Sequence, residues 1–278
     1  MNNAAGIAFV FADMDGTFLA DDKSVPVQNM RMLNMLADLQ IAFVPCTGRP
    51  VSAVPQELRD HRATCYAVGS NGAVIYDIRA QKALHVERMS KDKVLALYER
   101  VKHLHTTFDI FADGEVYSER ARYEAMGSYG IDEPTLAVLR KVRKPVGLSV
   151  PQLVDRAQSV EKVTCFWQNT HDRDELARAI ADIGGFSSAH GHPKNFELQA
   201  QGVSKGFALA WLCSHTGVPT SAAVAFGDEA NDVPMIREAG CGVAMANAIP
   251  EVLEAAQAVT ASNNEAGVAR YLQMLLAQ

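Results

Sequence analysis

The sequence contains few cysteines, and they form no recognisable pattern. Its 278 residues include five cysteines, no two of which lie in a Cys-x-x-Cys spacing: Cys46, Cys65, Cys165, Cys213 and Cys241. The odd number and wide spacing of the cysteines mean that neither a disulfide framework nor a zinc ribbon is indicated. We expect reduced thiols and therefore a cytoplasmic protein.

Long apolar runs and a basic N-terminal segment are also missing. The first apolar stretch, residues 6–12, ends at the acidic Asp13. A signal peptide has a longer apolar core behind a basic segment, and a membrane-spanning helix needs about 20 apolar residues. We therefore expect no targeting segment and no membrane partner.

Basic residues are not in excess. Lys and Arg number 26 and Asp and Glu 32, which gives a net charge of -6. Binding to a nucleic-acid backbone depends on clustered Lys and Arg, so the composition argues against a nucleic-acid partner. An anionic ligand would have to be small and held locally. The sequence indicates no particular oligomeric state.

What is present is a globular composition with a repeating pattern. The chain is 48% hydrophobic and 21% charged, and its length suits one large or two smaller domains. Short apolar runs alternate with helical patterns at both ends of the chain, which predicts parallel strands covered on both faces. Strands are expected at 7–12, 41–45, 222–226 and 241–245, and helices at 27–40, 205–217 and 231–240.

The middle of the chain has a different pattern. Amphipathic helices are expected at 91–105 and 173–184, an alternating strand at 162–169, and a hairpin turn at 112–116. We therefore predict an α/β fold with a Rossmann-like, doubly wound parallel-sheet core and an inserted α+β domain. The core is assigned to 1–82 and 192–278, and the insertion to 83–191.

Polar residues follow directly on the predicted core strands or open a predicted helix. The carboxyl ends of the strands of an open parallel sheet line one crevice, so we expect these residues to meet there. They fall in four groups: Asp13 with Asp15; Thr47, Gly48 and Arg49; Ser204 with Lys205; and Asp228, Asn231 and Asp232.

These residue types favour a cation together with a phosphate. Asp13 and Asp15 lie one residue apart, and crowded carboxylates repel unless a cation compensates their charge. Carboxylate oxygens suit Mg²⁺, whereas the group lacks the soft or imidazole ligands that zinc and copper prefer. The histidine pairs at 103–105 and 190–192 have no accompanying cluster and are not expected to bind metal.

Four segments resemble, in order, the motifs of the haloacid-dehalogenase-like hydrolase superfamily. They are "DMDGTFL" (13–19), "CTGR" (46–49), "GVSKGFAL" (202–209) and "GDEANDVPMI" (227–236). The position of the insertion is similar to that of the C2-type cap in the Cof-type sugar-phosphatase branch. "SNGAVIYD" (70–77) and "ASNNEAGVARYL" (261–272) are also similar to segments of that branch.

The resemblance implies a role for each matching position. Asp13 would be the nucleophile, and Asp15 the general acid and base and a metal ligand through its backbone carbonyl. Asp13 and Asp228 would bind Mg²⁺ through their side chains, with Asp232 close by. The expected phosphate-binding groups are Lys205, the Thr47 side chain, the Gly48 amide, the backbone near Met14 and the Asn231 side chain.

The implied activity is a Mg²⁺-dependent phosphatase that forms an aspartyl-phosphate and acts on small phosphorylated metabolites such as sugar phosphates. The insertion would set the preference among substrates. Three alternatives stay open: a phosphomutase of the same superfamily, a phosphoacceptor signalling protein, and an inactive binding protein.

Overall fold

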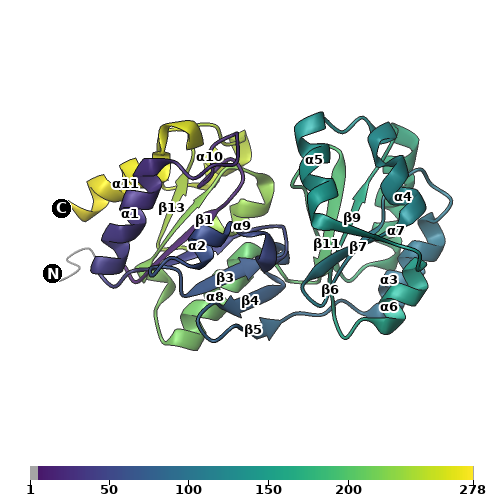
Figure 1. The fold of residues 1–278 in the computed structure, drawn as a ribbon, viewed down its shortest axis with the longest axis horizontal. Coiled ribbons are helices and arrows are strands. Elements are labelled where there is room, and N and C mark those ends of the chain that lie inside the picture. The colour runs from purple at the N-terminus through teal and green to yellow at the C-terminus, as the bar shows by residue number, and fades with distance from the viewer. Residues whose placement is uncertain (1–5, 278) are drawn as a thin grey trace. The chain divides into compact units, whose positions relative to one another are not determined.

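The computed structural model describes residues 6–277, which form two units (Figure 1). One unit combines the chain up to His85 with the chain from Ser204 onward, and the other is Val86–Val203. The sequence predicts boundaries after residues 82 and 191. The second boundary differs because strand β11 (Asn195–Ala200) pairs with β9 (Val160–Phe166) inside the inserted unit, so the chain leaves that unit only after β11.

The first unit contains an eight-stranded sheet. The strands β1, β2, β3, β12, β13 and β14 are parallel to their neighbours in this group, whereas β4 is antiparallel to β3. In spatial order the strands are β14 (Ala258–Val259), β13 (Cys241–Ala244), β12 (Ala223–Gly227), β1 (Phe9–Asp13), β2 (Ala42–Cys46), β3 (Tyr66–Gly69), β4 (Val74–Asp77) and β5 (Lys82–Val86).

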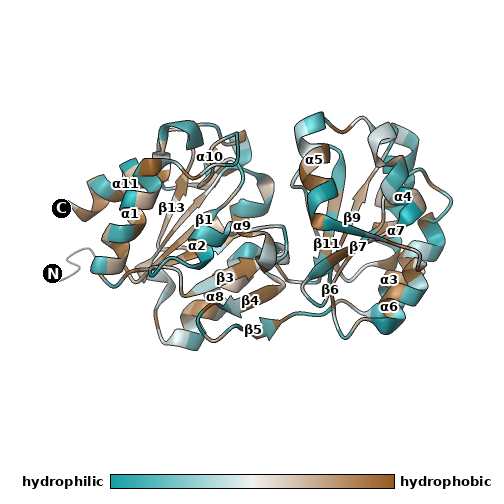
Figure 2. Cartoon of the chain, viewed as in Figure 1, coloured by the Kyte–Doolittle hydropathy of each residue, from teal (hydrophilic) through white to brown (hydrophobic). Residues whose placement is uncertain are grey.

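Two hydrophobic cores cover the two faces of this sheet. Along β1, Val10 and Ala12 belong to one core, and Phe9 and Phe11 belong to the other, as the alternation of a strand requires. The apolar interior is brown in Figure 2. The first core is closed by α1 (Val27–Asp38), α2 (Gln56–Arg59) and α11 (Gly267–Leu276), and the second by α8 (Lys205–Thr216), α9 (Val233–Glu238) and α10 (Pro250–Ala255). This confirms the doubly wound core.

The second unit is an α+β insertion with a six-stranded sheet. All its strand pairs are antiparallel except β7 with β8. In spatial order the strands are β10 (Phe186–Ala189), β11, β9, β6 (Asp109–Ala112), β7 (Glu115–Glu119) and β8 (Arg143–Val146). The helices are α3 (Lys91–Val101), α4 (Arg120–Ala125), α5 (Glu133–Val142), α6 (Val150–Arg156) and α7 (Thr170–Ile183).

Local chemistry explains where several elements end. Asp113 and Gly114 both have positive φ, 53° and 80°, and join β6 to β7 in the predicted hairpin. Gly217 ends α8 in a left-handed conformation, as predicted. The predicted strand 162–169 lies earlier in the structure because the Asn169 side chain caps α7, accepting a hydrogen bond from the Asp172 amide.

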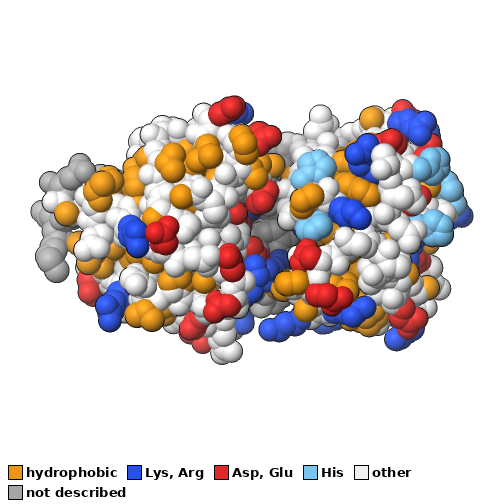
Figure 3. All heavy atoms as spheres, turned by 90° about the horizontal axis from the view of Figure 1, so that it is seen from above, with side chains coloured by type: hydrophobic (Ala, Val, Ile, Leu, Met, Phe, Trp, Pro, Cys, Tyr) orange, Lys and Arg blue, Asp and Glu red, His pale blue; other side chains and the backbone are white. Residues whose placement is uncertain are grey.

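The surface carries charges of both signs. On the face drawn in Figure 3, Lys and Arg side chains are interspersed with Asp and Glu side chains. Within residues 6–277, no helix has the length and apolar character needed to cross a membrane.

Candidate active site

Three adjacent parallel strands bring the predicted site residues to one edge of the core sheet. Asp13 ends β1 and pairs in register with Cys46, the last residue of β2, which Thr47 follows. On the other side of β1, Asp228 follows the last residue of β12. Parallel pairing therefore explains why residues far apart in sequence meet.

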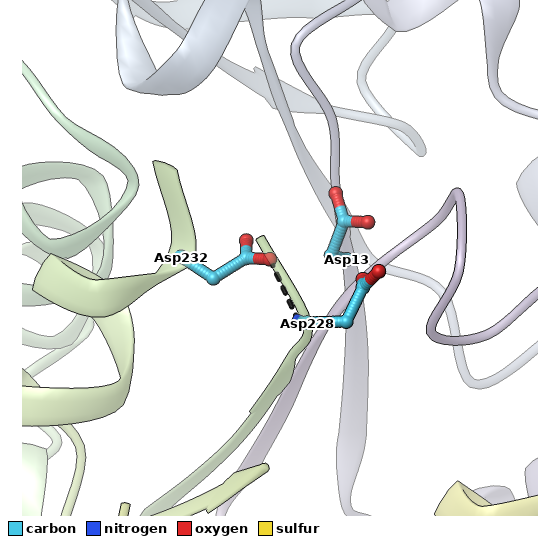
Figure 4. Close-up of side chains that lie close together, drawn as sticks. All are labelled: Asp13, Asp228 and Asp232. Carbon is cyan, nitrogen blue, oxygen red and sulfur yellow. Dashed lines mark hydrogen bonds between the residues drawn. The ribbon is translucent and has the colours of Figure 1, made fainter. Parts of the chain in front are cut away.

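Three buried carboxylates form the centre of the site (Figure 4). Side-chain oxygens of Asp13, Asp228 and Asp232 all lie within 4.8 Å of one another. Among the described residues, this is the group of acidic, histidine or cysteine side chains that could hold a metal ion. The sequence-predicted carboxylates are thus brought together, except for that of Asp15.

Lys205 is the cation next to this cluster. It is the first residue of α8, where the Ser204 hydroxyl accepts a hydrogen bond from the Phe207 amide and caps the helix. The Lys205 Nζ is fully buried, 2.5 Å from Asp13 Oδ1 and 2.6 Å from Asp232 Oδ1. One lysine therefore links two of the three carboxylates.

The pKa values show that Lys205 does not fully compensate the negative charge of the three buried carboxylates. Burial raises the pKa of Asp13 to about 7, with a further contribution from Asp232, although Lys205 opposes the shift. Burial also raises the pKa of Asp228 to about 9, together with the charges of Asp13 and Asp232. Burial alone would lower the pKa of Lys205, but the two carboxylates that it contacts raise it instead. The site thus favours an additional positive charge.

The available ligand atoms fit Mg²⁺. Asp232 has both oxygens engaged, because Oδ1 accepts from Lys205 and Oδ2 accepts from the amides of Asp228 and Glu229 at 3.0 and 3.1 Å. Asp228 is held by the Thr17 hydroxyl, which donates to its Oδ1 at 2.6 Å. Asp13 and Asp228 are therefore the better placed ligands, and hard carboxylate oxygens are what Mg²⁺ prefers.

Gly16 lets the first loop approach this cluster closely. Its φ is +80°, and a Cβ atom at this position would lie 2.2 Å from Asp228 Oδ2. Only glycine combines this backbone conformation with so little space.

The Asp15 side chain lies with two cations instead. Its Oδ1 is 2.9 Å from Lys23 Nζ, and its Oδ2 accepts a hydrogen bond from the Arg49 guanidinium. The sequence pointed to Arg49 as part of a polar group, but it did not suggest this pairing or any role for Lys23. The expected metal contact through the Asp15 carbonyl and the acid and base role stay predictions.

Two predicted phosphate-binding residues, Thr47 and Asn231, both hydrogen-bond to Asn71, a residue that the sequence did not single out. Thr47 is buried, and its carbonyl accepts a hydrogen bond from the Asn71 amide at 3.1 Å. The Asn231 Nδ2 donates to Asn71 Oδ1 at 3.1 Å. The Asn231 Oδ1 is buried and has no hydrogen-bond partner among the described residues. Asn71 lies in the segment "SNGAVIYD", whose resemblance to the family was the available signal.

The sequence also predicts two backbone groups in the phosphate site, those of Met14 and Gly48. Met14 is buried between Asp13 and Asp15, and its carbonyl accepts the Leu19 amide at 2.9 Å, which folds the loop back. Gly48 follows Thr47 directly, and the Thr47 hydroxyl accepts the Arg49 amide at 3.1 Å. The roles of the Met14 and Gly48 amides stay predictions.

The histidines of the second pair are used for structural bonds. His190 Nδ1 lies 2.6 Å from the Asn195 carbonyl, and His192 Nδ1 accepts the Lys194 amide at 3.0 Å. Neither belongs to the acidic cluster.

Comparison with known proteins agrees with this geometry. A sequence profile of haloacid dehalogenase-like hydrolases matches residues 10–272. The chain is 29% identical over 272 residues to YxeH of Bacillus subtilis, covering 95% of this chain and 96% of that one. It is 26% identical over 266 residues to the 5-amino-6-(5-phospho-D-ribitylamino)uracil phosphatase YitU of the same species, covering 94% of each.

The fold is also that of a solved relative. A haloacid dehalogenase-like hydrolase from B. subtilis superposes with a TM-score of 0.82 at 24% identity, covering 96% of this chain and 99% of that one. The matched residues include the acidic cluster and Lys205. The chain therefore belongs to the haloacid dehalogenase-like hydrolase family, as its four motifs predicted.

Proposed function

We propose that this protein is a Mg²⁺-dependent phosphatase that hydrolyses small phosphorylated metabolites through an aspartyl-phosphate on Asp13. The observation that carries the proposal is the buried triad of Asp13, Asp228 and Asp232, in which Lys205 donates to both Asp13 and Asp232. Membership of the hydrolase family supports it, as does the name of YitU, a phosphatase of a phosphorylated ribityl compound.

In the first step the Asp13 carboxylate attacks phosphorus. A P–O bond forms to Asp13 while the bond to the alcohol oxygen breaks, and Asp15 gives its proton to the departing alkoxide. Lys205 donates to Asp13 Oδ1 and so holds the carboxylate in one orientation. Fixing the attacking group before the reaction removes part of the entropic barrier.

In the second step Asp15 takes a proton from water. The resulting nucleophile attacks the acyl-phosphate, which releases phosphate and restores the Asp13 carboxylate. Lys23 and Arg49 are the groups that hold Asp15 between its two proton transfers.

Phosphate-ester hydrolysis is among the slowest uncatalysed reactions, so charge stabilisation has to dominate. When bound by Asp13 and Asp228, with Asp232 close by, Mg²⁺ would supply positive charge to the phosphoryl oxygens. Thr47, Asn231 and the amides of Met14 and Gly48 would bind the same oxygens. The Asn231 Nδ2 donates one hydrogen to Asn71 Oδ1, which presets the side-chain orientation and leaves the second Nδ2 hydrogen for a phosphoryl oxygen.

The inserted unit Val86–Val203 would contact the part of the substrate that is not phosphate and so set substrate preference. A cytoplasmic location stays a prediction that rests on the five free cysteines.

A panel of phosphometabolites tests the proposal. The purified protein is incubated with Mg²⁺ and each compound, and inorganic phosphate is measured. Release of phosphate from one or more compounds supports a phosphatase. Transfer of phosphate to another position of the same compound would identify a phosphomutase. A stable acyl-phosphate without turnover would identify a phosphoacceptor, and no change at all would indicate a binding protein.

A further inference from the structure

The loop after β1 is tied to two asparagines near the C-terminus. Asn263 is buried, and its Nδ2 donates to the Leu19 carbonyl at 3.0 Å and to Asp21 Oδ1 at 2.9 Å. Asn264 Nδ2 donates to Asp21 Oδ2 at 2.8 Å, and Asn264 Oδ1 accepts the Asp21 amide at 3.1 Å. Both asparagines belong to the segment "ASNNEAGVARYL" (261–272), and no residue of this segment takes part in the proposed catalytic steps.

A third asparagine extends this network to the site. Asn247 Nδ2 donates to the Gly16 carbonyl at 2.8 Å. Its Oδ1 accepts the Asn263 amide at 3.0 Å, so the two asparagines hold each other as well as the loop. We call Asn247, Asn263 and Asn264 the asparagine clamp.

The clamp reaches the loop directly after Asp15, at Gly16. Gly16 directly follows Asp15 and lies against the Asp228 carboxylate, where a Cβ atom would have no room. Two residues beyond Asn247, the Ile249 amide donates to the Asp228 carbonyl at 3.0 Å. The segment of Asn247 therefore holds both the loop of Asp15 and the loop of Asp228.

We propose that the asparagine clamp positions Asp15 for its proton transfers by fixing the backbone of the loop that follows it, at Gly16, Leu19 and Asp21. The inference rests on the proposed function, because it assigns Asp15 the acid and base role. Asn247, Asn263 and Asn264 are positioning residues: they bind the loop backbone and Asp21, and none of their hydrogen bonds goes to Asp13, Asp228 or Asp232. A small displacement of a general acid costs activity most where the leaving group needs its proton.

Asn247 is the best site for a test, because it is exposed and its replacement leaves no buried cavity. Asn247→Asp keeps an acceptor for the Asn263 amide but removes the donor to Gly16. Asn34→Asp is the matched control, because Asn34 is also exposed and its Nδ2 donates to the Met30 carbonyl on α1. Each variant is compared with the parent for turnover of p-nitrophenyl phosphate and phenyl phosphate, and for amide hydrogen exchange of residues 14–22.

Asn247→Asp should speed amide exchange in residues 14–22 and lower kcat for phenyl phosphate about tenfold more than for p-nitrophenyl phosphate, with little change in KM. Asn34→Asp should change neither measurement. Unchanged exchange, or faster exchange with equal losses on both substrates, would overturn the clamp. If the parent hydrolyses neither aryl phosphate nor any compound of the phosphometabolite panel, the proposed function fails, and the exchange measurement alone then decides whether the clamp holds the loop.

Discussion

The ammonium group of Lys205 and the carboxylate of Asp13 lie 2.5 Å apart, although 192 residues separate them in the sequence. Both side chains are buried, and each offsets part of the cost of burying the other. The pair stands at the point where the proposed nucleophile, the phosphate and Mg²⁺ would meet. Replacing either residue of the pair therefore tests how the charges of the site are balanced.

Replacing Lys205 by Met should destabilise the fold. Loss of the lysine leaves Asp13 and Asp232 buried without their cation, and breaking a buried pair in this way costs about 3–5 kcal/mol. Urea unfolding in the presence of a chelator measures the change. Lys144→Met is the control, because Lys144 forms an exposed pair with Glu115 and its loss should change the unfolding midpoint little. Equal shifts in both variants would contradict the pairing.

Asp13→Asn should abolish hydrolysis while keeping the fold. The two side chains have nearly the same shape, but the amide is no nucleophile, and loss of a covalent nucleophile costs far more than a hundredfold in turnover. Phosphate release measures the activity, and circular dichroism checks the fold. A variant that keeps more than about a hundredth of the parent turnover would rule out Asp13 as the nucleophile.

The metal-free protein should lose stability as the pH rises from about 4 to about 9, with Asp13 and Asp228 both contributing up to about pH 7 and Asp228 alone above it. The folded-state pKa values of Asp13 and Asp228 are raised to about 7 and about 9 from an ordinary value of 3.8. Between the ordinary value and these values the folded protein binds more protons than the unfolded chain, so its free energy of unfolding falls with increasing pH. Thermal unfolding with a chelator measures this.

Two comparisons check the cause of that pH dependence. Asp228→Asn removes the group whose pKa is raised to about 9 and should flatten the upper part of the curve. Added Mg²⁺ should raise the unfolding temperature most at high pH, where the carboxylates are ionised. A parent protein whose stability is independent of pH over this range would contradict the assigned pKa shifts.

Chelation should remove the activity, and Mg²⁺ should restore it. Ca²⁺ should not substitute, because it accepts more oxygens and tolerates bidentate carboxylates, which would engage both oxygens of Asp13 and leave none to attack phosphorus. Phosphate release after exhaustive dialysis against a chelator, then with each ion added, tests this. Full activity after dialysis would refute a role for the metal.

Gly16→Ala should lower both activity and stability. The added Cβ would overlap Asp228 Oδ2, at 2.2 Å, in a backbone conformation that alanine rarely adopts. Gly217→Ala separates the two effects, because Gly217 also has positive φ but a Cβ atom added there would meet nothing within 4 Å. Turnover should fall only in Gly16→Ala, and comparable turnover in both variants would show that the close approach to Asp228 is unimportant.

The candidate site could be predicted largely because its residues follow directly on local patterns. A short apolar run marks a buried strand, and parallel strands bring their carboxyl ends to one edge of the sheet. Asp13, Thr47 and Asp228 each stand directly after such a run. Their meeting thus depends on topology that the alternation of strands and helices already indicates.

Other features depend on contacts across the folded chain. In the helix expected at 27–40, the spacing of Met30, Leu33, Leu36 and Leu39 or Ala37 predicts one buried face. The structure buries Leu33 and Leu36 and half-buries Met30, but it also buries Asn29. The Asn29 Nδ2 donates to the Phe18 carbonyl at 2.9 Å, and the Asn29 Oδ1 accepts the Ala269 amide at 3.1 Å. These bonds satisfy a polar side chain that periodicity alone would place outside the core.

The sequence by itself determined the α/β class, which follows from periodicity. It also determined which polar residues follow the core strands and that acidic residues cluster there, because these follow from the residue types at strand ends. Only the tertiary structure decided that the insertion extends to Val203, that Thr17 holds Asp228, and that Asn247 holds Gly16. The Thr17 and Asn247 bonds join residues 211 and 231 positions apart, and a hydrogen bond at that separation depends on how the elements pack rather than on any local pattern.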